Sequence, residues 1–159
     1  GTNFLATEPN VTVGALTVVT TSLPIASQLF GRPQIEVVLL GGTLRHDAPD
    51  LTGALTDSSL ELVRTDIAFL GADAIDGEGW LYNRSPDVGR LLKRMAKASD
   101  RVFAVADHSK VGRHELMRFG RLREWDGLIS DEALDRDLIH QLRRHGSSVI
   151  VPEKGQRRG

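Results

Sequence analysis

Short apolar runs alternate with segments of helical periodicity along most of this chain. The runs are near-continuously apolar, which is typical of strands that are covered on both faces of a parallel sheet. Alternation of such strands with helices favours an α/β fold, with a mostly parallel sheet and helices on both faces. The predicted strands are residues 16–20, 35–40, 66–70, 101–106, 127–129 and 148–151.

The helical segments lie between these strands. We predict helices over residues 23–30, 50–64, 86–99 and 131–145. Ser22 is expected to cap the first of them, and Ser130 or Asp131 the last. For the second segment, an alternative is a shorter helix that begins at the capping box formed by Ser58 and Glu61.

Length and residue types exclude several classes of protein. A chain of 159 residues fits one domain. Cysteine is absent, which excludes disulfides and thiolate metal sites. The five histidines show no metal-binding spacing, and the glycines form no dinucleotide-binding motif. We therefore expect no metal and no cofactor.

Charge and hydropathy narrow the choice of partner. The net charge is −1 and the isoelectric point is near 6.6, whereas domains that grip nucleic acid are usually basic. No apolar run approaches the roughly 20 residues that span a bilayer, and the chain begins without a signal-peptide pattern. We expect a cytoplasmic protein that contacts neither a membrane nor, by itself, DNA.

Four polar loops begin where predicted strands end. Ligands of open parallel sheets bind beyond the carboxyl ends of the strands, so we expect these loops to share one edge and to form a pocket for a doubly negative group. Hydroxyls, backbone amides and cations can bind an anion, and glycines let the backbone approach it closely. For each loop there is also an alternative without a ligand: Ser22 as a helix cap, the glycine and aspartate loops as ordinary turns, and Asp107 with Lys110 as a surface ion pair. The loops contain Thr20, Thr21 and Ser22; Gly41, Gly42 and Arg45; Gly71, Asp73 and Asp76; and Asp107 and Lys110.

Six short sequence motifs, in a fixed order along the chain, resemble the C-terminal sensor domain of the DeoR family of bacterial sugar-metabolism repressors. The resemblance implies a fold related to ribose-5-phosphate isomerase and a phosphorylated sugar, or a metabolite derived from one, as the effector. It also implies a homo-oligomer that meets DNA only through an upstream helix-turn-helix domain absent from this sequence. The motifs are LTVVTTSLPIA (16–26), VVLLGGTLR (37–45), DIAFLGADAID (66–76), GRLLKRMAKAS (89–99), FAVADHSKVG (103–112) and WDGLISD (125–131).

The resemblance also locates a phosphate-holding turn near the start of the chain. The family has an Asp-Gly-Thr-Thr turn there, to which Gly1, Thr2 and Asn3 correspond with a departure at the third position. An alternative is that Gly1 and Thr2 do not belong to the natural protein. The expected organisation is a sensor domain over residues 1–151 and a polar tail over residues 152–159.

These observations favour an effector sensor without enzymatic activity. The first alternative is a sugar-phosphate isomerase, because Leu70-Gly71-Ala72-Asp73 resembles the Asp-Gly-Ala-Asp motif of ribose-5-phosphate isomerases. Leu70 replaces the first acid of that motif, and no counterpart of the enzymes' glycine-rich segment follows near Trp80. The second alternative is an oligomerisation module without a ligand. The sequence does not specify which phosphorylated sugar binds.

Overall fold

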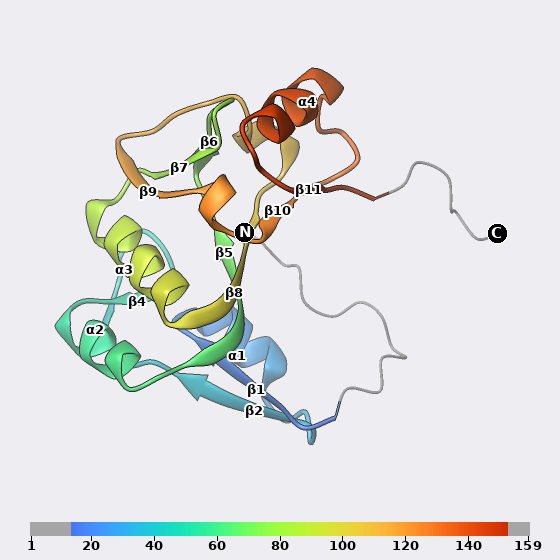
Figure 1. The fold of residues 1–159 in the computed structure, drawn as a ribbon. Helices are drawn as coiled ribbons and strands as arrows, with labels where there is room; N and C mark the ends of the chain where they lie inside the picture. Colours follow the sequence, from blue (N-terminus) through green and yellow to red (C-terminus); the bar gives the residue numbers. More distant parts are fainter. Residues whose placement is uncertain (1–13, 153–159) are drawn as a thin grey trace. The chain divides into compact units, whose positions relative to one another are not determined.

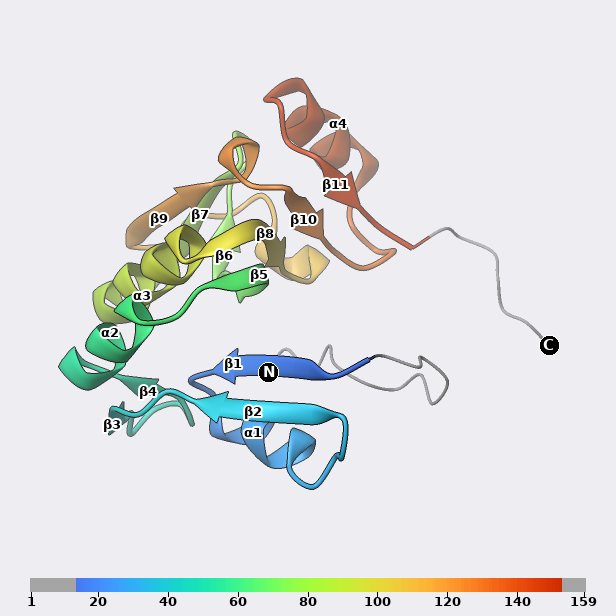
Figure 2. The same cartoon turned by 60° about the horizontal axis from the view of Figure 1, so that its bottom comes forward.

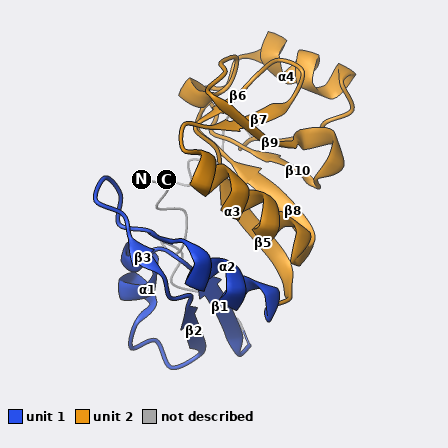
Figure 3. Ribbon diagram, turned by 90° about the vertical axis from the view of Figure 1, so that its left-hand side faces the viewer, with its two compact units in different colours: residues 1–63 blue, residues 64–159 orange. Residues whose placement is uncertain are grey.

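The computed structural model describes residues 14–152 (Figure 1). The chain forms two compact units, Gly1–Val63 and Arg64–Gly159 (Figure 3). Gly1, Thr2 and residues 153–159 of the predicted tail lie outside the described residues. No helix within residues 14–152 is long and apolar enough to cross a membrane.

The first unit contains a parallel strand pair and a small antiparallel pair. Strands β1 and β2 run parallel with Thr20 opposite Leu39, so their carboxyl ends lie next to each other. Strands β3 and β4 pair antiparallel. The elements are β1 (Leu16–Thr20), α1 (Leu23–Leu29), β2 (Ile35–Leu39), β3 (Thr43–Leu44), β4 (Leu51–Thr52) and α2 (Ala54–Glu61).

The second unit contains a parallel sheet in the order β11-β10-β8-β5 and an antiparallel sheet in the order β6-β7-β9. Figure 2 shows the strands of the parallel sheet side by side. The strands are β5 (Thr65–Gly71), β6 (Ala74–Ile75), β7 (Trp80–Asn83), β8 (Ser99–Val105), β9 (Met117–Arg121), β10 (Gly127–Ile129) and β11 (Val149–Ile150). The helices are α3 (Pro86–Lys97), α4 (Arg136–Arg144) and the short 3-10 helices η1 (His108–Lys110) and η2 (Leu122–Glu124).

All six predicted strands are present, and each pairs in parallel with a neighbour. Five further strands, β3, β4, β6, β7 and β9, were not predicted, and all of them pair antiparallel. They are short, and β9 carries an arginine at positions 118 and 121, so they lack the continuous apolar run that marks a buried parallel strand. The prediction of parallel pairing is therefore right for the four-stranded sheet and for the β1–β2 pair, and wrong for the β3–β4 and β6-β7-β9 sheets.

Two predicted helices begin later than expected. Helix α4 begins at Arg136 because Asp135 caps it, with Oδ1 accepting hydrogen bonds from the amides of Asp137 and Leu138. Neither Ser130 nor Asp131 is its cap. Helix α2 covers Ala54–Glu61 because residues 51 and 52 form β4, and the alternative start at Ser58 is wrong.

The start of α1 also differs from the prediction. Ser22 occupies the N-cap position, but its side chain makes no capping hydrogen bond. The amide of Leu23 donates instead to the carbonyl oxygen of Pro49 at 3.0 Å. Because the amide of Leu23 is engaged in this way and Pro24 has no amide hydrogen, the first turn of α1 offers few amides to an anion.

The core of the second unit joins both sheets to α4. Leu128 from β10, Ile75 from β6, Leu81 from β7, Leu122 from η2 and Leu142 from α4 are each fully buried in one cluster. Ala104 of β8 belongs to the same cluster, one residue before the end of that strand. The core therefore anchors the strand that leads into the polar turn at residues 107–110.

A polar network holds the β6–β7 turn. Asp76 Oδ1 accepts hydrogen bonds from the amides of Glu78 and Trp80 at 3.0 Å, and Oδ2 accepts from the hydroxyl of Tyr82 at 2.7 Å. Arg118 Nε donates to the same hydroxyl oxygen at 3.0 Å, and its guanidinium lies 4.7 Å from the centre of the Trp80 ring. Both carboxylate oxygens of Asp76 thus stabilise the turn.

The core predicts a clear difference between two leucine variants. Leu142→Ala should lower the free energy of unfolding by about 2–5 kcal/mol, because it leaves a cavity in a fully buried cluster. Leu116→Ala, at a side chain that is 78% exposed, should change it by less than about 0.5 kcal/mol. Urea unfolding of both variants measures the difference, and equal values would contradict this description of the core.

The network also predicts the titration of Tyr82, which is the only tyrosine in the sequence. Burial raises the pKa of Tyr82 above its ordinary value of 10.0, the bond to Asp76 raises it further, and the bond from Arg118 opposes the rise. Asp76→Asn should lower this pKa by removing the negative partner, while Asp87→Asn should not change it. Ultraviolet absorbance of the phenolate follows the titration.

The same raised pKa sets the sign of the stability change in alkali. Above pH 10 the native state keeps a phenol proton that the unfolded chain loses, so the contribution of Tyr82 to stability is present below that pH and decreases as pH rises through the native pKa. A Tyr82 phenolate that forms at the same pH in the wild type and in Asp76→Asn would rule out the network as a cause.

Candidate functional site

The turn after β8 lies between the loops that follow two neighbouring parallel strands. Val105, the last residue of β8, pairs with Gly71 at the end of β5 and with Ile129 at the end of β10. Asp73 follows the first of these ends and Asp131 the second. Residues 71–73, 107–110 and 130–131 therefore follow three adjacent carboxyl ends, the edge at which open parallel sheets bind ligands.

Asp107 shapes the turn. Its Oδ1 accepts a hydrogen bond from the amide of Ser109 at 2.8 Å and another from the Ser109 hydroxyl. The Ser109 hydroxyl is the main reason that the pKa of Asp107 lies below its ordinary value of 3.8, and the ammonium of Lys110 lowers it further. Asp107 is therefore an ionised, exposed acceptor at the edge of the sheet.

Lys110 brings a positive charge to the same turn. Its amide donates to the carbonyl oxygen of Asp107 at 3.0 Å, and its side chain is half-buried. Within residues 14–152, no ion pair engages its ammonium group. The surface ion pair with Asp107, given above as an alternative, is thus not formed, and the cation can meet an external anion.

Asp73 is partly engaged within the second unit. Its Oδ2 accepts a hydrogen bond from the amide of Arg84 at 2.9 Å, and the Arg84 Nε lies 3.7 Å from the same oxygen. Its own amide donates to the carbonyl oxygen of Tyr82 at 3.0 Å. These contacts fix the loop after Gly71.

A contact between His108 and Asp131 was not predicted. Asp131 Oδ2 accepts a hydrogen bond from the His108 amide at 2.8 Å, Oδ1 lies 2.9 Å from the ring Nδ1, and Oδ1 also accepts from the amide of Ala133 at 2.9 Å. Burial acts to raise the pKa of Asp131, but these bonds hold it below 3.8. The sequence signal for this contact was the position of Asp131 two residues after the predicted strand 127–129.

The same residues approach the spacing of metal ligands. One side-chain ligand atom each of Asp107, His108 and Asp131 lie within 4.8 Å of one another. The hydrogen bonds that Ser109, His108 and Ala133 give to the two carboxylates account for this arrangement. We therefore assign no metal to it.

In the first unit, the loops after β1 and β2 contact each other. Thr20 is buried, its carbonyl oxygen accepts a hydrogen bond from the amide of Leu40 at 2.9 Å, and its hydroxyl oxygen accepts from the amide of Ser22 at 3.1 Å. The carbonyl oxygen of Thr21 accepts from the amide of Leu51 at 2.9 Å. These bonds bring Thr20–Ser22 to the loop that begins at Gly41.

Close packing explains the glycine at position 42. A Cβ atom there would lie 2.0 Å from the hydroxyl oxygen of Thr56 and 2.7 Å from the carbonyl oxygen of Thr52. Thr56 is fully buried and donates its hydroxyl to the carbonyl oxygen of Gly41 at 2.6 Å. The pair Gly41–Gly42 thus has a structural role in the first unit.

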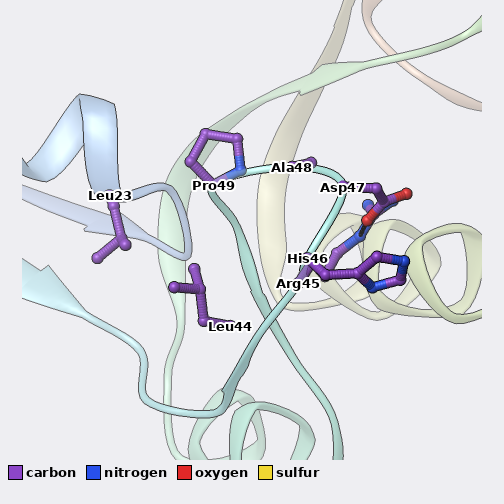
Figure 4. Close-up of a pocket in the computed structure, with 7 residues that line it drawn as sticks. All are labelled: Leu23, Leu44, Arg45, His46, Asp47, Ala48 and Pro49. Atoms are coloured by element: carbon purple, nitrogen blue, oxygen red, sulfur yellow. Dashed lines mark hydrogen bonds and ion pairs between the residues drawn. The ribbon is translucent and has the colours of Figure 1, made fainter.

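Arg45 borders a pocket in the same unit. Its Nε and Nη2 atoms donate to the two carboxylate oxygens of Asp47 at 3.0 and 2.7 Å, and this pairing holds the pKa of Asp47 below 3.8. Figure 4 shows Leu23 and Leu44 at one end of the pocket and Asp47 at the other. The pocket has a volume of about 370 Å³ and is lined by Leu23, Leu44, Arg45, His46, Asp47, Ala48 and Pro49.

The predicted contacts fall into three groups. Thr20, Thr21, Ser22, Gly41, Gly42 and Arg45 belong to the first unit, and Gly71, Asp73, Asp107 and Lys110 to the second. Gly1 and Thr2 are outside the described residues. The structure brings neighbouring loops together within each unit, and the single edge shared by all four loops stays a prediction.

Comparison with known proteins identifies similar sequences. The model of the DeoR C terminal sensor domain matches residues 1–132. The HTH-type transcriptional regulator GlpR of Haloferax volcanii is 35% identical over 137 residues, or 86% of this chain and 53% of the relative. The putative aga operon transcriptional repressor of Escherichia coli O157:H7 is 32% identical over 132 residues (83% and 49%). The HTH-type transcriptional repressor GlcR of Bacillus subtilis is 31% identical over 140 residues (88% and 54%).

These comparisons agree with the resemblance inferred from the six sequence motifs. The chain spans about half the length of the curated relatives it matches. All three relatives are named as regulators of transcription, so they give no support to the isomerase alternative. A family model that covers residues 1–132 and relatives that align over more than four-fifths of the chain show that this protein belongs to the DeoR C-terminal sensor domain family.

Proposed function

We propose that this chain senses a phosphorylated sugar, or a metabolite derived from one, for a transcriptional regulator of carbohydrate metabolism. The observation that carries the proposal is the turn at residues 107–110, where the ammonium of Lys110 has no ion-pair partner among the described side chains. The turn stands at the edge of the sheet where α/β proteins bind ligands.

The strength of such a site follows from its charges. A hydrogen bond between a charged donor and a phosphate contributes about 1.5–3 kcal/mol. Three or four such bonds, less the cost of association, correspond to dissociation constants from roughly 1 mM to 1 µM. That range suits a metabolite sensor, because the occupancy of a site changes most when the ligand concentration is near the dissociation constant.

The proposal includes parts of the protein beyond these residues. We infer that DNA is bound by a helix-turn-helix domain outside this sequence, that the regulator is a homo-oligomer, and that the fold is related to ribose-5-phosphate isomerase. Two of the relatives are named as HTH-type regulators, and the chain covers only about half of each. The net charge of −1 is also low for a domain that binds DNA directly.

Removal of the cation at position 110 should weaken effector binding. Lys110→Ala should lower the affinity for a sugar phosphate at least about tenfold, which corresponds to the loss of one charge-assisted bond. Calorimetric titration with ribose 5-phosphate, fructose 6-phosphate and glucose 6-phosphate measures the change, after thermal-shift screening has shown which of them stabilises the protein.

A matched lysine provides the control for this experiment. Lys93 is exposed on α3, and Lys93→Ala should bind with the affinity of the wild type. Equal affinities of the wild type and Lys110→Ala would remove Lys110 from the site. If none of the sugar phosphates raised the melting temperature, the sensor function itself would be wrong and the oligomerisation module would take its place.

The second part of the proposal concerns DNA. We expect the 159-residue chain to cause no mobility shift of duplex DNA at physiological salt. Binding to DNA is driven largely by counterions that basic side chains displace from the phosphates, and this chain has a net charge of −1. The full-length gene product should shift its own promoter DNA, and an effector sugar phosphate should change that shift. Tight DNA binding by the 159-residue chain alone would contradict the proposed division of labour.

A further inference from the structure

His108 is held in one orientation by a residue from the neighbouring strand end. Both the ring and the amide of His108 contact the carboxylate of Asp131, at 2.9 Å from Nδ1 to Oδ1 and at 2.8 Å from the amide nitrogen to Oδ2. The imidazole nevertheless remains 52% exposed. A rigid but accessible ring at the edge of a parallel sheet is suited to contact a ligand.

The partner of Nδ1 determines which ring nitrogen carries the proton. Within residues 14–152, every other bond to Asp131 comes from a backbone amide donor, and the pKa of Asp131 lies below its ordinary value, so the carboxylate is an ionised acceptor. Nδ1 must then be the donor in its contact with Oδ1. In the neutral ring, Nε2 consequently carries a lone pair and can only accept a hydrogen bond.

We propose that His108 accepts a hydrogen bond from a hydroxyl group of the effector through Nε2, and that Asp131 is the positioning residue that selects this tautomer. This inference rests on the proposed function. It adds a residue that recognises the polyol part of a sugar phosphate, whereas Lys110 recognises the phosphate.

The neighbouring groups match such a ligand. Asp107 Oδ1 receives both bonds from Ser109, and within residues 14–152 no donor is bonded to Oδ2. The turn therefore presents two acceptors, Asp107 Oδ2 and His108 Nε2, together with the cation of Lys110. Arg113 is occupied with the carbonyl oxygen of Ser109. Two acceptors beside one cation fit a molecule that combines adjacent hydroxyls with a phosphate, and they fit inorganic phosphate less well.

The sharpest variant is His108→Asn. The asparagine amide can still donate to Asp131 in place of Nδ1, and the backbone bond is unchanged, but no atom replaces Nε2. Affinity for the sugar phosphates should fall about three- to tenfold, as expected for one neutral hydrogen bond, while affinity for inorganic phosphate should stay within about twofold. His140→Asn, at an exposed histidine of α4, is the matched control.

The tautomer is measured separately by nitrogen-15 nuclear magnetic resonance of the imidazole ring. The neutral ring of His108 should carry its proton on Nδ1 in the wild type, in contrast to the Nε2-protonated form that free histidine prefers. Asp131→Asn should shift the population toward Nε2–H and lower the sugar-phosphate affinity in parallel. A purely structural role for Asp131 would not change the tautomer.

The outcomes separate this inference from the function on which it rests. If the wild type binds at least one of ribose 5-phosphate, fructose 6-phosphate and glucose 6-phosphate, and His108→Asn binds it equally well, the role of His108 is wrong and the sensor function stands. A wild-type His108 ring that carries its proton on Nε2 would likewise show that the proposed role of His108 is wrong, and would leave the sensor function standing. If the wild type binds none of them, both proposals fail together.

Discussion

The parallel pairing of β8 with β5 on one side and β10 on the other is the constraint on which the candidate site depends. Val105 pairs with Gly71 and with Ile129, so three strand ends coincide and the polar residues that follow them gather at one edge. The pairing is held by a buried core in which Ala104, Leu128 and Leu142 meet. Ala104 and Ala106, just before the turn, belong to this close-packed cluster. Close packing therefore fixes the position of the backbone from which the charged side chains of the turn extend.

Hydrogen bonds then decide how each charged group can act. Asp131 accepts bonds from His108 and Ala133 and is committed to holding the turn, whereas Asp107 uses only one carboxylate oxygen for its own turn. Asp76 accepts three hydrogen bonds that hold the β6–β7 turn, with both of its carboxylate oxygens engaged. Carboxylates that looked equivalent in the sequence therefore have different roles, because an oxygen that already accepts protein donors has less capacity for a ligand.

The main sheet could be predicted because its strands read as near-continuous apolar runs, the pattern typical of parallel strands. Burial is less complete than that pattern suggests, since Ile67 and Phe69 of β5 are exposed. Residues 99–105 and 127–129 form such strands, and the polar turn after the first of them was expected at the right place. The antiparallel strands escaped prediction because Trp80–Asn83 and Met117–Arg121 are short and mixed in polarity. The start of α4 was misplaced because Asp131 and Asp135 are both good cap residues; in the structure Asp131 bonds to His108 and Asp135 caps the helix.

The amino-acid sequence by itself determined the α/β class, the positions of the parallel strands and the family to which the chain belongs, because these follow from local periodicity and from the order of short motifs. Only the tertiary structure decided that Lys110 has no ion-pair partner among the described residues, that Arg45 is paired with Asp47, and that Asp131 holds His108. Such contacts join residues from different strand ends or depend on the conformation of a loop, and neither the distance nor the direction of a hydrogen bond is encoded in the spacing of residues along the chain.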